Sequence, residues 1–487
     1  MEKRTVSTAF TDTVDTRLGR QLAPLEAAHP GLSGLTPLLD GHDAFAARIA
    51  LARSAQRSLD VQYYIWRHDL SGTLLFDELR RAADRGVRVR LLLDDYGTAG
   101  NDDFLAALDA HPLIEVRLFN PFALRHTRWL NFPLDFSRLN RRMHNKSFTA
   151  DNQATIIGGR NIGDEYFEAG PDVLFIDLDA LAIGAVVHEV SRVFDDYWAC
   201  SSAYPVHRLL GPPSPGEISR VQTEADRLRK SPRAQTYLRS VDAPGFVEKI
   251  TSGALVSDWA KVTVLADDPA KGLGRAADSG LLTTHLWETI GQPAHSLDLV
   301  SPYFVPTQSG VASFAAMAKQ GVKVRVLTNA LEATDVAVVH SGYAKRRPAL
   351  LASGVELYEI KSTAKRPVRI FRRGGRSHSS LHAKTFALDG RRVFVGSFNF
   401  DPRSARLNTE LGFMIESPLL AREINEAFDE LVPQQSYQVR LGPSGRLQWV
   451  TPRADGSEEM LDREPGTTPW QRGALWFLAH LPIEPLL

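Results

Sequence analysis

The chain of 487 residues contains the same order of segments twice. Residues 58–66 open with Ser-Leu-Asp and continue as an apolar, aromatic strand pattern, and residues 296–304 open in the same way 238 positions later. A helix pattern and a second apolar strand pattern follow in each copy, the strands at 86–94 and 321–329. The repetition restricts the chain to a fold built from two similar halves.

Strand, helix and strand alternate in each half, and the strand patterns are nearly continuous apolar runs. Such runs are typical of a sheet covered by helices on both faces. We therefore expect an α/β fold of two duplicated α/β/α sandwich domains with mixed, mostly parallel sheets. The Pro-rich and polar stretches between the repeats place the domains at 1–240 and 241–432. Residues 433–487 match neither repeat and are expected to pack on the core or to lie at a membrane interface.

A short motif of the form H-x-K-x4-D occurs once in each half. Apolar residues alternate with others after each histidine, so we expect a strand that carries the histidine and lysine on one face. The aspartate falls at a turn-like pair, Asp-Asn in the first half and Asp-Gly in the second. The motif residues are His144, Lys146 and Asp151 and, 238 positions later, His382, Lys384 and Asp389.

The pattern G-[GS]-x-N follows each motif after six residues. A hairpin would return this pattern to the face that carries the histidine and lysine, where neutral amide and hydroxyl groups can bond a substrate. We therefore expect four substrate-binding residues in the two copies: Gly159, Asn161, Ser397 and Asn399.

These residue types suit the cleavage or transfer of a phosphodiester. A neutral imidazole can attack phosphorus, and a protonated imidazole can donate its proton to the leaving alkoxide. Two lysines can neutralise charge on the phosphoryl oxygens without a metal ion. One histidine cannot act as nucleophile and acid in the same step, so we expect one composite active site at the interface of the two domains.

No metal site or cofactor is expected. The only His-x3-His pair is His378 and His382. It lacks the glutamate of a zinc-binding H-E-x-x-H helix, and it runs from an Arg/Gly/Ser loop into a strand.

At the paired motifs the sequence resembles the phospholipase D superfamily. Residues 59–72, 143–167 and 482–487 are similar to one branch, the bacterial cardiolipin synthases of the C type, and the resemblance covers nearly the whole chain. It implies a phosphatidyltransferase that joins two phospholipids into cardiolipin through a phosphohistidine. A phospholipase D or nuclease that hydrolyses the same bond is the alternative, because water replaces the alcohol only in the second step. A lipid-binding pseudoenzyme is a third possibility.

The resemblance also implies roles for residues. The two histidines form the nucleophile and acid–base pair, the two lysines bind phosphate, and the two aspartates orient the motif. In many superfamily members a carboxylate bonds the second nitrogen of the nucleophilic histidine, which fixes its tautomer. The candidates here are Glu410 and Asp177, with Asp179 as an alternative to Asp177. Both histidines stay candidates for the nucleophile.

Charge and hydropathy bear on the partners. Lys+Arg and Asp+Glu both number 57, so no nucleic-acid partner is expected from net charge. No signal peptide is seen, and no apolar run approaches the ~20 residues that cross a bilayer. We expect a cytoplasmic protein, or one peripheral on the inner membrane. The resemblance implies phosphatidylglycerol as a substrate, phosphatidylethanolamine as a second candidate, and an accessory protein in some relatives.

A basic, aromatic segment precedes each motif. Residues 125–142 hold five arginines and one aspartate, and residues 361–376 hold seven basic residues and no acid. We hypothesise a collar that docks the mouth of the site on anionic headgroups. Solvated loops with incidental charge are the alternative. Several further residues are expected either to line the pocket or to pack in the core: Tyr63, Tyr64, Trp66, Tyr303, Phe304, His340 and Tyr343.

Overall fold

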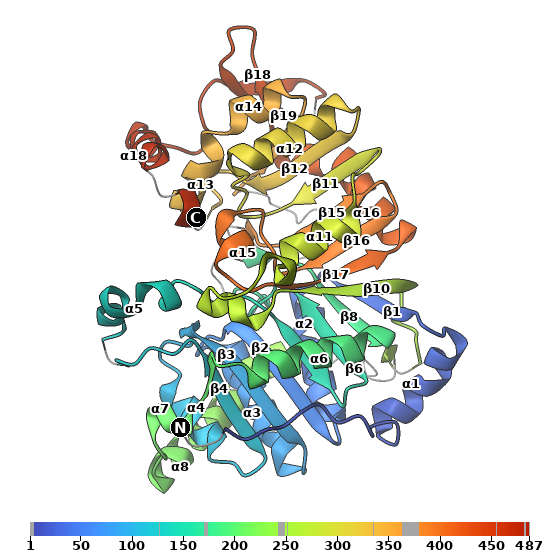
Figure 1. The fold of residues 1–487 in the computed structure, drawn as a ribbon, viewed down its shortest axis with the longest axis vertical. Coiled ribbons are helices and arrows are strands. Elements are labelled where there is room, and N and C mark those ends of the chain that lie inside the picture. Colours follow the sequence, from blue (N-terminus) through green and yellow to red (C-terminus); the bar gives the residue numbers. More distant parts are fainter. Residues whose placement is uncertain are drawn as a thin grey trace.

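The structure, a computed structural model, consists of two similar halves whose strands form one continuous sheet (Figure 1). It describes residues 4–125, 127–169, 174–241, 249–250, 252–334, 336–362, 379–453, 455–481 and 484–486. Within these ranges the sheet has 18 strands. The halves meet where β1 (Ser33–Leu38) pairs antiparallel with β10 (Asp258–Ala266).

The strand order of the first half is repeated in the second. The first half contributes β9 (Ala203–Pro205), β4 (Ile114–Phe119), β3 (Arg88–Gly97), β2 (Ser58–Ile65), β5 (Ser147–Ala150), β6 (Ala154–Gly158), β8 (Asp179–Gly184) and then β1. From β10 the second half continues with β17 (Leu411–Glu416), β16 (Arg392–Gly396), β15 (Thr385–Leu388), β11 (Ser296–Val300), β12 (Lys323–Asn329), β13 (Glu356–Ile360), β18 (Ser436–Leu441), β19 (Leu447–Pro452) and β20 (Glu458–Leu461).

The expected α/β class with mixed sheets is confirmed. Parallel pairing, which was expected to prevail, is confined in the large sheet to the three central strands of each half, β2–β3–β4 and β11–β12–β13. The other pairs are antiparallel, among them β5–β6 and β15–β16, which the hairpin that follows each H-x-K-x4-D motif joins.

Helices cover both faces of the sheet. The first half has α1 (Arg17–Ala28), α2 (Gly41–Ser54), α3 (Leu70–Asp84), α4 (Asp102–Asp109), η1 (Arg128–Asn131), α5 (Phe132–Leu139), α6 (Ala185–Ala199), α7 (His207–Leu210), α8 (Pro215–Arg229) and α9 (Pro232–Val241). The second half has η2 (Pro269–Leu273), η3 (Asp278–Gly280), α11 (Leu282–Ile290), α12 (Thr307–Lys319), α13 (Ala337–Ala344), α14 (Arg347–Ala352), α15 (Pro402–Arg406), α16 (Pro418–Glu430), α17 (Val432–Gln435), α18 (Pro469–His480) and η4 (Glu484–Leu486).

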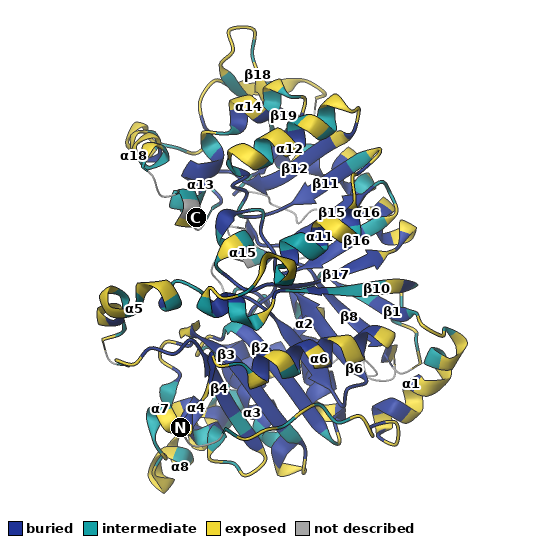
Figure 2. Cartoon of the chain, viewed as in Figure 1, coloured by how far each residue is buried: buried dark blue, intermediate teal, exposed yellow. Residues whose placement is uncertain are grey.

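One hydrophobic core runs from the first half into the second. It includes Val190 and Phe194 on the inner face of α6 and Leu420 and Phe428 on the inner face of α16, together with strand residues of both halves. Figure 2 shows the buried strands and the exposed outer surfaces of the helices around them. Because apolar surface is buried across the boundary, the two halves are held in a fixed relation.

The chain after α17 continues the second half. Strands β18, β19 and β20 extend its sheet beyond β13, and α18 packs against α13. The loop after β20 is tied down by buried Glu464, which accepts hydrogen bonds from Arg347 at 2.6 Å and from His340 at 2.9 Å. His340 therefore anchors this segment.

Candidate active site

A cavity of about 500 Å³ lies between the two halves and is lined by both motif histidines. The first half also contributes Tyr64, Asn161 and Tyr166 to its wall, and the second half contributes Tyr303, Asn399 and Ser404. A larger cleft, of about 960 Å³, lies between α6 and β10 and is lined, among the described residues, by side chains other than those of the motifs. The smaller cavity is therefore the candidate active site.

The motif lies at the start of a hairpin in each half. The strands begin at Ser147 and Thr385, so the histidine and lysine occupy the extended segment just before the strand, which was expected to include them. The lysine still lies beside the histidine in each motif: Lys146 donates to the backbone carbonyl of His144, and Nζ of Lys384 lies 2.9 Å from Nδ1 of His382.

The motif aspartates fix the hairpin to the central strand. Asp151 accepts hydrogen bonds from the backbone N–H groups of residues 56, 57 and 58, where β2 begins. Asp389 does the same with residues 294, 295 and 296 before β11. Both have positive φ, 51° and 52°, as the first position of a tight hairpin turn requires. Among the described residues that line the cavity neither aspartate is found, and both hold the hairpin turn against the start of the central strand.

Each motif histidine is bonded by a carboxylate of the other half. Nδ1 of His144 donates to Oε2 of Glu410 at 2.8 Å, and Nδ1 of His382 donates to Oδ2 of Asp177 at 2.5 Å. All four side chains are buried. Because Nδ1 is engaged in both rings, Nε2 is the nitrogen that each histidine can turn to a substrate.

Strand-like backbone pairing across the interface brings these groups together. The N–H of His144 donates to the carbonyl of Thr409 at 2.9 Å, directly before Glu410. The N–H of His382 donates to the carbonyl of Ile176 at 2.8 Å, directly before Asp177, where β14 (Ser379–Leu381) pairs with β7 (Leu174–Ile176). The two carboxylates thus occupy equivalent places in the repeat.

Asp179, the alternative to Asp177, has a different partner. Its Oδ2 accepts from the buried guanidinium of Arg48, a residue of α2, at 2.8 Å. Residues two positions apart in a strand point to the same face, so Asp177 and Asp179 would share one environment if both belonged to a strand. Asp177 precedes β8 and lies in a loop, which frees it from the strand's alternation.

Two of the predicted substrate-binding residues, Ser397 and Gly159, lie against the carboxylates and are not among the described residues that line the cavity. The hydroxyl of Ser397 donates to Glu410 at 2.5 Å. A Cβ added at Gly159 would lie 2.1 Å from Oδ1 of Asp177, so only glycine leaves room for this carboxylate. Asn161 and Asn399 do line the cavity. The buried Oδ1 of Asn399 has no hydrogen-bond partner within the described part of the chain, which leaves it available to a substrate hydroxyl.

Ser404 was missed in the sequence. Its hydroxyl donates to Oε1 of Glu410 at 2.7 Å, and it accepts from the N–H of Asn399 at 3.3 Å. Tyr166 holds the equivalent place in the first half, since its hydroxyl accepts from Asn161 at 3.0 Å. Tyr166 and Ser404 are 238 positions apart, the offset of the two motif histidines, but they differ in residue type, and neither was singled out in the sequence.

The two histidines lie in different electrostatic surroundings. Burial and the charges of Lys146 and Lys384 hold the pKa of His144 well below its ordinary value. Burial and Lys384 also lower the pKa of His382, but Asp177 opposes this. Burial raises the pKa of Asp177, yet His382 and Lys384 outweigh it and keep that carboxyl ionised. Burial raises the pKa of Glu410 to about 7.

The remaining pocket candidates divide between wall and core. Tyr64 and Tyr303 line the cavity, and the Tyr64 ring packs edge-on against His144 with centroids 5.0 Å apart. The others are buried in the hydrophobic cores: Tyr63, Trp66, Phe304 and Tyr343.

Three arginines of the first basic segment, residues 125–142, pair with acidic side chains of the protein, contrary to the hypothesis of a collar that docks on headgroups. Arg125 and Arg128 pair with Asp95 and Asp102, and Arg142 is buried against Asp94. Their guanidinium groups are therefore neutralised by acids of β3 and of the start of α4 and offer little to a headgroup. The second segment, 361–376, lies outside the described residues from position 363 onward.

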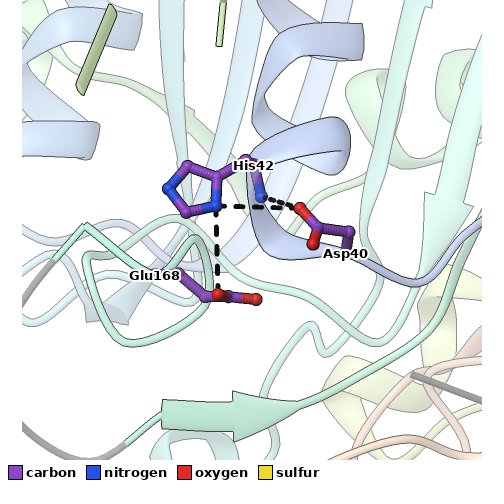
Figure 3. A group of neighbouring side chains, drawn as sticks. All are labelled: Asp40, His42 and Glu168. Atoms are coloured by element: carbon purple, nitrogen blue, oxygen red, sulfur yellow. Dashed lines mark hydrogen bonds and ion pairs between the residues drawn. The ribbon is translucent and has the colours of Figure 1, made fainter. Parts of the chain in front are cut away.

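One group of side chains in the described residues could hold a metal ion, away from the cavity: Asp40, His42 and Glu168 (Figure 3). Both carboxylates already accept backbone N–H groups at the start of α2, Asp40 from residues 42 and 43 and Glu168 from residue 41. These capping hydrogen bonds explain why the three side chains lie close together at the start of α2. His378 lies outside the described residues.

Two H-x-K-x4-D motifs that meet at one cavity, on a duplicated α/β/α scaffold, define the phospholipase D class of phosphodiester enzymes. A family model described as "Cardiolipin synthase, PLD-like domain" matches residues 49–198 and 286–432, one motif in each segment, and the chain belongs to this family.

Three comparisons show the range of similar proteins. Cardiolipin synthase C of Escherichia coli K12 is 50% identical over 473 residues, which cover 97% of this chain and all of that protein. An uncharacterised protein of Helicobacter pylori J99 is 33% identical, over 88% of this chain and 85% of its own length. The crystal structure of phosphatidylserine synthase from Haemophilus influenzae Rd KW20 has a TM-score of 0.56 at 14% identity and covers 86% of this chain and 92% of its own, which shows the shared fold.

Gly159 leaves the space that the carboxylate of Asp177 occupies beside His382. In Gly159→Ala the new methyl group must displace the carboxylate from His382, and we expect phosphodiester turnover to fall by about 10- to 100-fold, as for other losses of a partner that orients a reactive group. Gly216→Ala, at the exposed start of α8, is the matched control, because its Cβ would meet only the hydroxyl of Ser214, at 3.9 Å. Turnover is measured at equal folded fraction. Wild-type turnover in Gly159→Ala would contradict the positioning role.

Proposed function

We propose that this protein is a phosphatidyltransferase that makes cardiolipin from two phospholipids through a phosphohistidine intermediate. The observation that carries the proposal is the convergence of His144 and His382, one from each half, on a single cavity with each Nδ1 bonded to a buried carboxylate. The lipid substrates are inferred from the identity to Escherichia coli cardiolipin synthase C over that protein's whole length.

We assign the attack to Nε2 of His144. Its pKa is the more strongly lowered of the two, so this imidazole is neutral and its lone pair is available near neutral pH. As the phosphorus–nitrogen bond forms, the bond to the donor's headgroup oxygen breaks, and the phosphatidyl group is held on His144.

His382 acts as acid and then as base. It is paired with ionised Asp177, which stabilises an imidazolium, and the negative charge of a bound phosphodiester further favours the protonated ring. His382 protonates the departing alkoxide, then removes the proton from the acceptor's hydroxyl. That oxygen attacks phosphorus, the phosphorus–nitrogen bond breaks, and His144 is released.

The lysines and asparagines act on the phosphate. Burial and, to a smaller extent, the charge of Lys384 lower the pKa of Lys146, and a phosphodiester anion bound between the two lysines would favour their charged forms. Asn161 and Asn399 offer amide groups at the cavity wall. Asp151 and Asp389 keep each hairpin in register, and Glu410 and Asp177 orient the rings.

The lipid substrates and the cellular location are proposed on the same basis, the identity to Escherichia coli cardiolipin synthase C. We propose phosphatidylglycerol as the acceptor, with phosphatidylethanolamine as a donor, and action at the cytoplasmic face of the inner membrane. None of the helices in the described ranges combines the length and apolar character needed to cross a bilayer. Whether an accessory protein is required is decided by the activity of the purified chain.

The transfer itself is tested with purified protein and vesicles of labelled phosphatidylglycerol and phosphatidylethanolamine. We expect labelled cardiolipin from the intact protein, and a loss of about 10³-fold or more in His144→Ala and in His382→Ala. His285→Ala, a partly exposed histidine on α11, is the control. Phosphatidic acid as the sole product would instead support hydrolysis, and full activity in either motif variant would refute the shared site.

A donor with a good leaving group separates the two histidine roles. Phosphatidyl-p-nitrophenol needs no proton on its leaving oxygen, so His382→Ala should release about one equivalent of p-nitrophenolate and retain the phosphatidyl group on the protein. Mass spectrometry of peptides should locate the group on His144. His144→Ala should give no burst. A burst in His144→Ala, with the adduct on His382, would reverse the assignment.

A further inference from the structure

Two exposed apolar segments flank the cavity, one from each half. We name residues 124–139, which contain η1 and α5, the first arm, and residues 469–486, which contain α18 and η4, the second arm. Nine of the eighteen large apolar side chains that are exposed in the described residues belong to these short segments. The most prominent are between 51% and 89% exposed: Trp129, Leu134, Phe136, Trp470, Trp476 and Phe477.

Both arms extend from the same side of the molecule (Figure 1). Figure 2 shows exposed surface on each of them. They are also joined to the cavity wall: Phe132 and Leu139 of the first arm and Leu486 of the second line it. Helix α18 packs on α13, whose Val338 and Val339 line it as well. Each arm therefore contributes apolar side chains both to the exposed surface and to the wall of the cavity.

The charges of the arms are compatible with an anionic surface. Arg125 and Arg128 are held by Asp95 and Asp102, and the one acid of the first arm, Asp135, is paired with Arg138 at 2.6 Å. Helix α18 contains Arg472 and no acidic residue, and Glu484 of η4 is paired with Lys345 and Arg346. The internal arginine pairs thus fix the base of the first arm, and exposed acids do not repel a bilayer from either tip.

From these observations we propose that the two arms insert into the surface of a phospholipid bilayer and hold the cavity mouth against it. Large exposed apolar patches mark interaction sites, and tryptophan favours the boundary between headgroups and acyl chains. Two separate protruding tips suit a deformable bilayer better than the matched surface of a folded protein. The inference rests on the proposed function for its substrate, because a phospholipid could then enter the cavity between the arms without leaving an apolar environment.

The test uses the full chain and vesicles of phosphatidylethanolamine and phosphatidylglycerol in a 3:1 ratio. Binding is measured by flotation. We expect Leu134→Ser/Phe136→Ser and Trp476→Ser/Phe477→Ser each to weaken binding about tenfold, and the combination to weaken it by about 100-fold or more, since each removes side chains that would be buried in lipid. Val14→Ser/Met460→Ser, which changes exposed apolar residues outside the arms, should bind as the wild type does.

A second readout separates docking from catalysis. With a short-chain phosphatidylglycerol below its micelle concentration, the arm variants should retain wild-type turnover, whereas on vesicles their turnover should fall in parallel with binding. Loss of both activities, or vesicle binding that is unaffected by the four substitutions, would overturn the proposal. If the wild type binds vesicles only when another protein is added, the arms serve a protein partner. Arm-dependent binding without any cardiolipin product would leave the docking surface established and the proposed function refuted.

Discussion

The structure depends on a reciprocal hydrogen bond across the pseudosymmetric interface. Each motif histidine finds its carboxylate in the other half, His144 at Glu410 and His382 at Asp177, and in each case backbone pairing of the preceding residue sets the approach. A half-molecule would contain an imidazole without its partner and a buried carboxylate without its donor. An unpaired buried charge is costly, so the same contacts that assemble the site also favour association of the halves.

The two halves share one scaffold, but the carboxylates that bond their motif histidines lie in different surroundings. Glu410 is surrounded by the hydroxyls of Ser397 and Ser404 and has a pKa near 7, whereas Asp177 lies against Gly159 and stays ionised. Stepwise transfer needs one neutral nucleophile and one proton carrier, and a strictly symmetric pair would offer neither role a preference. The differences between Ser397 and Gly159, at the same place in the repeat, are thus of the kind that can separate the two functions.

Much of the fold and the centre of the site could be predicted from the sequence. Strand–helix–strand patterns at a fixed offset gave the α/β class, and motif spacing identified the histidines, lysines and carboxylate candidates. The charge of residues 125–142 was misread because their partners lie 23 to 48 positions earlier, Asp94 and Asp95 in β3 and Asp102 at the start of α4. A local count of charges cannot show such pairs. Likewise, the sequence offered both Asp177 and Asp179 as the carboxylate that bonds a motif histidine. Only the loop before β8 places Asp177, and not Asp179, beside His382.

The most direct test of the reciprocal contacts is a pH titration of the two motif imidazoles by NMR in protein labelled at histidine. We predict that His144 titrates at a lower pH than His382. We also predict that Asp177→Asn, which removes the charge favouring the imidazolium, lowers the pKa of His382, while the pKa of His144 changes much less. A shift confined to His144 in this variant, or no shift in either imidazole, would contradict the cross-half pairing.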